Sequence, residues 1–244
     1  MCGRYVTPEQ AALEREYGIG PRQSVEQVFR QSYNVAPTDE VPVLRVVREI
    51  AGSREVTGMR WGLIPFSAHG QPTAYSTINA TIESLETAPT WRGPWRRSQR
   101  CVMPCVGFYE WHVNLDGSKQ PYFIRPTEDG ATFPLAGLWD RSITPSGEVI
   151  ESCAVITMPA NDLLARIHNA KRRMPAILAH QDVDTWLRGT PEQAKAILRA
   201  YPSDAMVAWP VSTRVNSTKN NGPDLIQPID VPPRPLDLFG SADA

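Results

Sequence analysis

The sequence predicts a single α+β domain whose strands, mostly antiparallel, form a curved sheet or a partly closed barrel with several short flanking helices. Short segments rich in β-branched and aromatic residues are scattered along the whole chain, and helical segments lie between strand pairs joined by short turns. The 244 residues include 23 prolines and seven tryptophans, which favours many short elements over long helices. No internal repeat or strong linker divides the chain. We therefore expect one domain over residues 1–230 and a proline-rich, poorly ordered tail over residues 231–244.

The elements expected in the first hundred residues follow from capping residues and β-branched runs. After an opening strand, Thr7 is expected to cap a helix that has Pro8 at its first position and ends near Gly18. Further segments are then expected in this order: an extended segment over 33–38, paired strands over 41–48 and 54–61 joined at Gly52-Ser53, a loop over 66–73, and a strand or extended segment over 75–80 that leads into a helix near Ile82.

The rest of the chain alternates predicted strands and short helices. A buried strand over 101–106 is expected to continue through 107–111, and Asp116-Gly117 marks a hairpin. Strands are expected over 121–126, 135–141, 149–158 and 206–215, and helices over 182–187, from Asn161 as N-cap to His168, and from Thr190 as N-cap to Tyr201.

Composition and charge narrow the function classes. The net charge of −1 gives no global attraction for nucleic acid, so nucleic-acid binding would require a local basic patch. Glutamates interrupt any apolar run near the N-terminus, and no apolar stretch approaches the ~20 residues of a membrane span. We expect a cytoplasmic, monomeric protein with no membrane contact and with its four cysteines reduced.

Cys2 directly follows the initiator methionine, which is an unusual position for a thiol. If Met1 is removed, Cys2 carries a free α-amine, with a reference pKa of about 7.7–8.0, beside a thiol with one of about 8.5. The amine can condense with an aldehyde to an imine, and the thiol can then close a five-membered thiazolidine. Alternatively, the sulfur could attack an amide with the amine as base. The structural alternative is a small buried residue in a first strand with Met1 retained.

Three other side chains could complete a site with Cys2. Glu110 lies among aromatic residues, where burial would raise its pKa and suit it to proton transfer; the alternative is a solvent-facing position on the strand. His168 is followed by cations that would lower its pKa and keep its imidazole neutral, unless it is a surface residue at a helix end. Asn79 could donate to a substrate oxygen or cap the following helix.

Other motifs bear on nucleic-acid binding and metal chemistry. Residues 91–100 interleave aromatics with arginines, as a single-stranded nucleic-acid track does, although a proline-broken helix end is the favoured interpretation. Residues 171–173 could bind phosphate or simply complete a helix C-terminus. Cys101 and Cys105 lack a second ligand pair, and no phosphate-binding or dinucleotide motif is present, so neither a metal nor a cofactor is expected.

Several segments resemble the SOS-response-associated peptidase (SRAP) family, whose members form a covalent link to abasic sites in single-stranded DNA. The resemblance covers about residues 1–230, and it rests on these motifs in this order: Met1-Cys2-Gly3-Arg4-Tyr5, residues 33–38, residues 60–65, Ile78-Asn79-Ala80, residues 100–104 and 107–111, Ala136-Gly137-Leu138-Trp139, residues 168–175, and Val215-Asn216-Ser217 with the polar run to Pro228.

The resemblance implies a role for each candidate residue. Cys2 would form the thiazolidine with the ring-opened abasic sugar after self-removal of Met1, the peptidase step. Glu110 would handle the protons of the amine, and His168 would act on the sugar hydroxyl during ring opening and reversal, with Asn79 beside the aldehyde. The kinked single strand, the expected partner, would be held by Arg4, Asn34, Trp61 and Arg173. The protein would be associated with the nucleoid when bound to DNA.

Two departures and two alternatives accompany this resemblance. Thr81 stands where the family often has arginine, which leaves Arg92 or Arg96 as candidates for that phosphate contact, and His168 and Arg173 lie five residues apart rather than two. Glutamine amidotransferases also begin Met-Cys-Gly, so an N-terminal-cysteine amidohydrolase is a second hypothesis. A nucleic-acid-binding module with a structural Cys2 is a third.

Overall fold

The computed structural model describes residues 2–18, 29–47 and 53–230, so Met1, Gly52 of the expected turn and the expected tail lie outside the described residues. The strands of the described chain are β1 (Tyr5–Val6), β2 (Glu40–Val46), β3 (Arg54–Trp61), β4 (Asn79–Thr81), β5 (Arg100–Cys105), β6 (Gly107–Val113), β7 (Lys119–Pro126), β8 (Phe133–Ile143), β9 (Val149–Pro159), β10 (Arg173–Pro175) and β11 (Met206–Pro210). The α-helices are α1 (Gln10–Tyr17), α2 (Pro89–Arg96), α3 (Asp162–Ile167), α4 (Val183–Arg188) and α5 (Pro191–Ala196).

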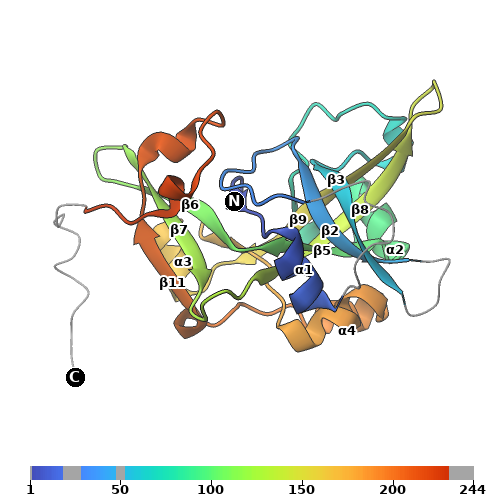
Figure 1. Ribbon diagram of the computed structural model, residues 1–244. Helices are drawn as coiled ribbons and strands as arrows, with labels where there is room; N and C mark the ends of the chain where they lie inside the picture. The colour runs from blue at the N-terminus through green and yellow to red at the C-terminus, as the bar shows by residue number, and fades with distance from the viewer. Residues whose placement is uncertain (1, 19–28, 48–52, 231–244) are drawn as a thin grey trace.

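A partly closed barrel of five strands, β9-β3-β2-β5-β8, forms the larger part of the fold (Figure 1). Its ring closes because β9 pairs antiparallel with β8 and parallel with β3. The long strand β9 also carries β4 and β10 on its later residues. The residues of β5 are all buried, and α4 packs against this strand while α2 packs against β8. The predicted α+β class with a partly closed barrel is confirmed.

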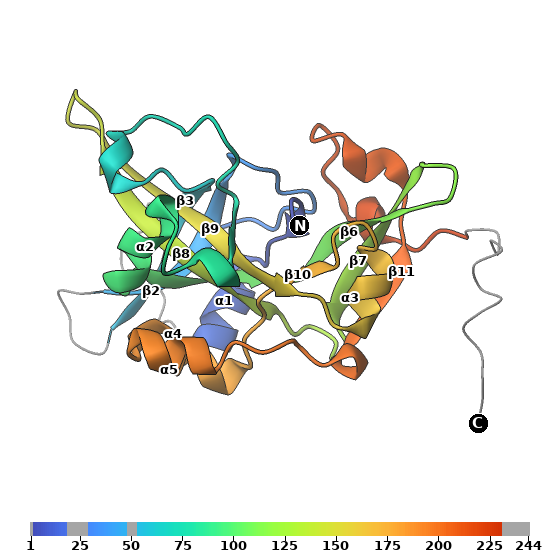
Figure 2. The same cartoon turned by 180° about the vertical axis from the view of Figure 1, so that it is seen from behind.

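A second sheet of four antiparallel strands, in the order β1-β6-β7-β11, stands beside the barrel. Figures 1 and 2 both show the N-terminal segment between this sheet and the barrel, and Figure 2 shows β10 in the same region. A smaller apolar cluster stabilises the second sheet, with Val6, Tyr109, Phe123, Val211 and Val215 buried together. The junction of barrel and sheet is therefore where the beginning of the chain is held.

Several local predictions are confirmed. The strand predicted over 54–61 matches β3, and Gly117, with φ 80°, lies in the hairpin between β6 and β7. The Asn161 side chain accepts a hydrogen bond from Leu164 N at the start of α3. Thr190 forms a capping box with Gln193 at the start of α5. Helix α2 covers Pro89–Arg96, so a helix ends within residues 91–100 as expected, but it continues through Pro94, and Trp91 and Trp95 are buried in the core instead of solvated.

Tertiary contacts overturn other predictions. Thr7 is not an N-cap: its amide and hydroxyl both bond the Ser32 backbone, so α1 begins only at Gln10. The strand predicted through 101–111 is two strands in different sheets, because the chain crosses from barrel to sheet at Val106, whose amide bonds Val6 O.

Three elements are also shorter than predicted, and a turn replaces one predicted helix. The strand expected over 75–80 is ordered as β4 only from Asn79, and a single 3₁₀ turn over Ile82–Ser84 replaces the helix expected there. Helix α5 ends at Ala196 instead of Tyr201. Strand β11 ends at Pro210 because the Val211 amide bonds Pro121 O and the chain turns away into a 3₁₀ turn.

Neither a membrane-spanning helix nor a metal-ligating cluster occurs among the described residues. No described helix has both the length and the apolar character needed to cross a bilayer. Within the same residues, no three His, Cys, Asp or Glu side chains gather in a way that could hold a metal ion. All four cysteines are free and buried.

Candidate active site at the N-terminal cysteine

Cys2 is fully buried at the junction of the barrel and the second sheet. On one side, Tyr5 pairs with Phe108 and the Tyr109 amide donates to Arg4 O at 3.0 Å, so the first residues run along β6 toward Glu110. On the other side, Asn79 Nδ2 donates to Cys2 O at 2.9 Å. Burial, reinforced by Glu110, raises the pKa of the Cys2 thiol, which is therefore protonated at neutral pH.

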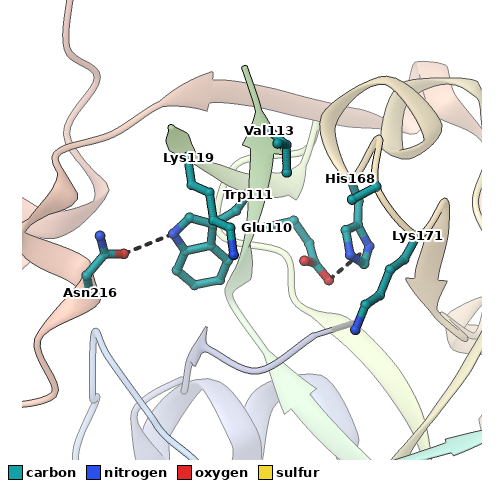
Figure 3. A pocket seen from close by; sticks show the side chains of 8 residues that line it. Glu110, Trp111, Val113, Lys119, His168, Lys171 and Asn216 are labelled. Atoms are coloured by element: carbon teal, nitrogen blue, oxygen red, sulfur yellow. Dashed lines mark hydrogen bonds and ion pairs between the residues drawn. The ribbon is translucent and has the colours of Figure 1, made fainter. Parts of the chain in front are cut away.

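Glu110 and His168 form a buried acid–base pair next to this segment (Figure 3). His168 Nδ1 lies 3.6 Å from Glu110 Oε1 and 2.9 Å from the Arg173 carbonyl oxygen. Burial raises the pKa of Glu110 to about 7, and burial lowers the pKa of His168. The carboxyl group can thus give or take a proton near neutral pH while the imidazole is neutral.

The protonated nitrogen of His168 follows from its contact. A carbonyl oxygen only accepts hydrogen bonds, so Nδ1 donates to Arg173 O and the neutral ring keeps Nε2 as an acceptor. The directions predicted from the sequence for both pKa shifts are confirmed. The main cause predicted for His168 is wrong, because burial lowers its pKa more than the neighbouring Lys171 cation does.

A pocket of about 390 Å³ opens beside the acid–base pair. Its lining residues are Glu110, Trp111, Val113, Lys119, His168, Ala170, Lys171 and Asn216. Sequence reasoning assigned no role to Trp111, Lys119 or Asn216. Trp111 Nε1 donates to Asn216 Oδ1 at 2.9 Å, a contact across 105 residues that no local pattern indicates. Lys119 could have been found, since the Asp116-Gly117 hairpin sets its position opposite Val113.

Comparisons with known proteins give the family of this chain. Residues 1–218 match the family described as SOS response associated peptidase (SRAP). The chain belongs to the SRAP family. It is 35% identical over 231 residues to "Abasic site processing protein YoqW" of Bacillus subtilis (strain 168), covering 93% of this chain and 99% of that protein. It is 31% identical over 268 residues to "Abasic site processing protein HMCES" of Gallus gallus, covering 95% of this chain and 79% of that protein.

Solved structures with the same fold include a protein from Bacteroides thetaiotaomicron. Its crystal structure superposes on this SRAP chain with a TM-score of 0.79 at 25% identity, covering 93% of this chain and 100% of that one. A protein from Bordetella bronchiseptica gives a TM-score of 0.73 at 28% identity.

Arg4 and Asn34 are expected from the SRAP resemblance to hold DNA. In the described structure they bond to each other and to the segment after Val211. Arg4 Nη1 donates to Asn34 Oδ1 at 2.8 Å and to Val215 O at 2.7 Å. Asn34 is buried, and its Nδ2 contacts the carbonyl oxygens of Val215, Ser217 and Asn220. These hydrogen bonds fix the loop that carries Asn216 against the N-terminal segment. The DNA contacts of both residues stay predictions.

Trp61 and Arg173 also have protein partners. Trp61 is fully buried, its Nε1 donates to Ile78 O at 3.0 Å, and its ring meets the Tyr5 ring edge-on. The Arg173 guanidinium donates to both carboxylate oxygens of Glu83, at 2.9 and 3.0 Å. Their expected contacts with a single strand stay predictions. In the described structure, Trp61 supports the segment that leads to Asn79.

Proposed function

We propose that this protein crosslinks itself to abasic sites in single-stranded DNA through Cys2, after removal of Met1, and so shields the lesion. The observation that supports this most is the position of Cys2, whose carbonyl is held by Asn79 while its chain runs along β6 beside Glu110. Membership of the SRAP family supports it as well, since relatives of this chain are named abasic site processing proteins.

The reaction begins with hydrolysis of the Met1–Cys2 amide by the protein itself, which consumes one water and frees the α-amine. That amine attacks the aldehyde carbon of the ring-opened abasic sugar and forms a carbinolamine. Protonation of the carbinolamine hydroxyl releases water and leaves an imine. The thiol sulfur then adds to the imine carbon, and the thiol proton passes to nitrogen. The product is a thiazolidine, formed with net loss of one water and no redox change.

The environment of each group suits this order of steps. A thiol whose pKa is raised by burial is a poor first nucleophile, so the amine reacts first and the S–H group supplies the last proton. Glu110, with a pKa of about 7, protonates the leaving hydroxyl and takes the amine proton. His168 Nε2, an acceptor in the neutral ring, takes the proton of the C1 hydroxyl as the bond from C1 to the ring oxygen breaks, and passes it to that oxygen; on reversal the transfer runs the other way.

Incubation of the purified protein with single-stranded DNA that bears one abasic site tests the proposal on a denaturing gel. Intact mass of the free protein reports whether Met1 is absent. We expect a stable adduct with the wild type and none with Cys2→Ala. Cys2→Ser keeps the amine but cannot form a thiazolidine, so its adduct should survive only after borohydride reduction. No adduct with the wild type, or the same adduct with Cys2→Ala, would refute the crosslink. Glutamine hydrolysis without an adduct would instead support the amidohydrolase hypothesis.

A further inference from the structure

Two lysines line the pocket beside Glu110 and His168 without a protein partner. Lys119 and Lys171 are both exposed, and within the described chain neither side chain has an ion pair or a hydrogen bond. Some other surface cations are paired: Arg173 with Glu83, Lys195 with Glu86 and Arg214 with Asp224. Two ammonium groups that form no ion pair at one pocket supply the local basic patch that a chain of net charge −1 needs for an anionic ligand.

A tight turn between α3 and β10 positions Lys171. The amides of Lys171 and Arg172 both donate to His168 O, at 3.2 and 2.8 Å, and the Ala160 amide donates to Arg172 O at 3.0 Å. Arg172 adopts the left-handed conformation with φ 49°, which is uncommon for a residue other than glycine. These bonds fix the backbone next to His168, so the Lys171 side chain lies at the pocket rather than on a free loop.

The β6–β7 hairpin positions Lys119. Lys119 pairs with Val113, and side chains of directly paired residues lie on the same face of a sheet. Trp111 lies on that face too, two residues before Val113. Figure 3 shows the Lys119 and Lys171 side chains on either side of the Glu110 carboxyl group.

We infer that Lys119 and Lys171 bind the two phosphate groups that flank the abasic nucleotide, one on each side of the reacting sugar. The inference rests on the proposed function, because it takes Glu110 as the centre of the reaction. A nucleotide within a strand has a phosphate on either side of its sugar, and the two ammonium groups stand on either side of Glu110 in the same way. A pKa of about 7 leaves much of Glu110 uncharged at neutral pH, which limits its repulsion of the phosphates.

The two lysines are better placed for the phosphate contact than Arg92 and Arg96, the candidates expected from the sequence. Arg92 and Arg96 lie on α2, which packs against β8 of the barrel. Figures 1 and 2 both show α2 on the side of the molecule away from β6 and β7. Thr81, where the family often has arginine, bonds Ser84 through its hydroxyl. Cations at the pocket therefore come from the second sheet and from the turn after His168.

Binding to single-stranded DNA that carries a tetrahydrofuran analogue of the abasic site tests this inference. The analogue has no aldehyde, so affinity is measured apart from Cys2 chemistry and a failure of the crosslink would not affect the result. Fluorescence anisotropy at several salt concentrations is compared for the wild type, Lys119→Gln, Lys171→Gln and the double variant. Lys195→Gln is the matched control, because Lys195 lies on α5 and pairs with Glu86.

Each pocket variant should bind about five- to tenfold more weakly near 0.1 M salt, with a log–log salt slope smaller by about 0.7 per contact. Lys171→Arg keeps the positive charge and should therefore bind nearly as tightly as the wild type. A neutral methylphosphonate at one flanking phosphate should abolish the effect of one lysine variant, and a methylphosphonate at the other flank that of the second. Unchanged affinity, or a loss that persists equally with both methylphosphonates, would overturn the inference.

Discussion

Replacement of Glu110 by glutamine tests the electrostatics of the site. The pKa of Glu110 is raised by burial from its ordinary 4.5 to about 7, so the folded chain holds this proton more tightly than the unfolded chain. Stability from the protonated group is therefore complete below pH 4.5 and is lost as pH rises from 4.5 to about 7. The difference between the two pKa values corresponds to about 3 kcal/mol in the free energy of unfolding.

Glutamine has nearly the same shape as glutamate but no titratable group, so the comparison isolates the effect of the Glu110 proton on stability. Melting temperatures of the wild type and Glu110→Gln are measured by calorimetry between pH 4 and pH 8. The unfolding free energy of the wild type, relative to the variant, should fall by about 3 kcal/mol over this range. For a domain of this length that difference is about 6–12 °C in melting temperature.

A carboxylate with the opposite pKa shift supplies the control. The pKa of Glu83 is lowered, chiefly by its hydrogen bonds from Arg173, so its contribution is lost as pH falls below 4.5. The difference between the wild type and Glu83→Gln should therefore change only at the acidic end of the series. A difference for Glu110→Gln that is constant with pH, or that grows in favour of the wild type as pH rises, would refute the reasoning.

Three further substitutions test the scaffold through unfolding free energies in denaturant titrations. Gly107→Ala should destabilise by about 2–3 kcal/mol, because a Cβ there would lie 2.3 Å from the Phe123 ring; wild-type stability would contradict this. Asn161→Ala should cost about 1 kcal/mol through loss of the cap to Leu164 N, and no change would show that the cap is unimportant. Asn34→Ala removes the donor to three carbonyl oxygens and should cost about 2–3 kcal/mol, whereas a loss of DNA affinity alone would indicate direct contact.

Local chemistry made parts of the fold predictable. Asn161 and Thr190 cap helices because a side-chain oxygen satisfies an amide three residues on, which depends on nothing distant. Gly117 marks its hairpin because the turn needs a positive φ. Predictions failed where a distant partner intervened. Thr7 has the properties of a cap, yet Ser32 takes both of its hydrogen-bonding groups.

The residues of the site also divide into those that the sequence made predictable and those that it did not. Residue types alone made Cys2 a candidate aminothiol, Glu110 a candidate acid in aromatic surroundings and His168 a candidate base at a helix end. Their neighbours could not be found this way, because Trp111 and Asn216, or Arg4 and Val215, meet across more than a hundred residues. The period of apolar residues and the spacing of motifs along the chain carry no information about such distant contacts.

The sequence by itself predicted the fold class of this protein and supplied the residue types on which the proposed chemistry depends. It placed a thiol beside a potential amine and supplied an acid, a base and the alternation of short strands that makes an α+β barrel. Only the tertiary structure decided where that chemistry lies. Closing the barrel through β9 and crossing to a second sheet at Val106 bury Cys2 between Asn79 and β6. Burial, which depends on the whole chain, then sets the pKa values of Glu110 and His168.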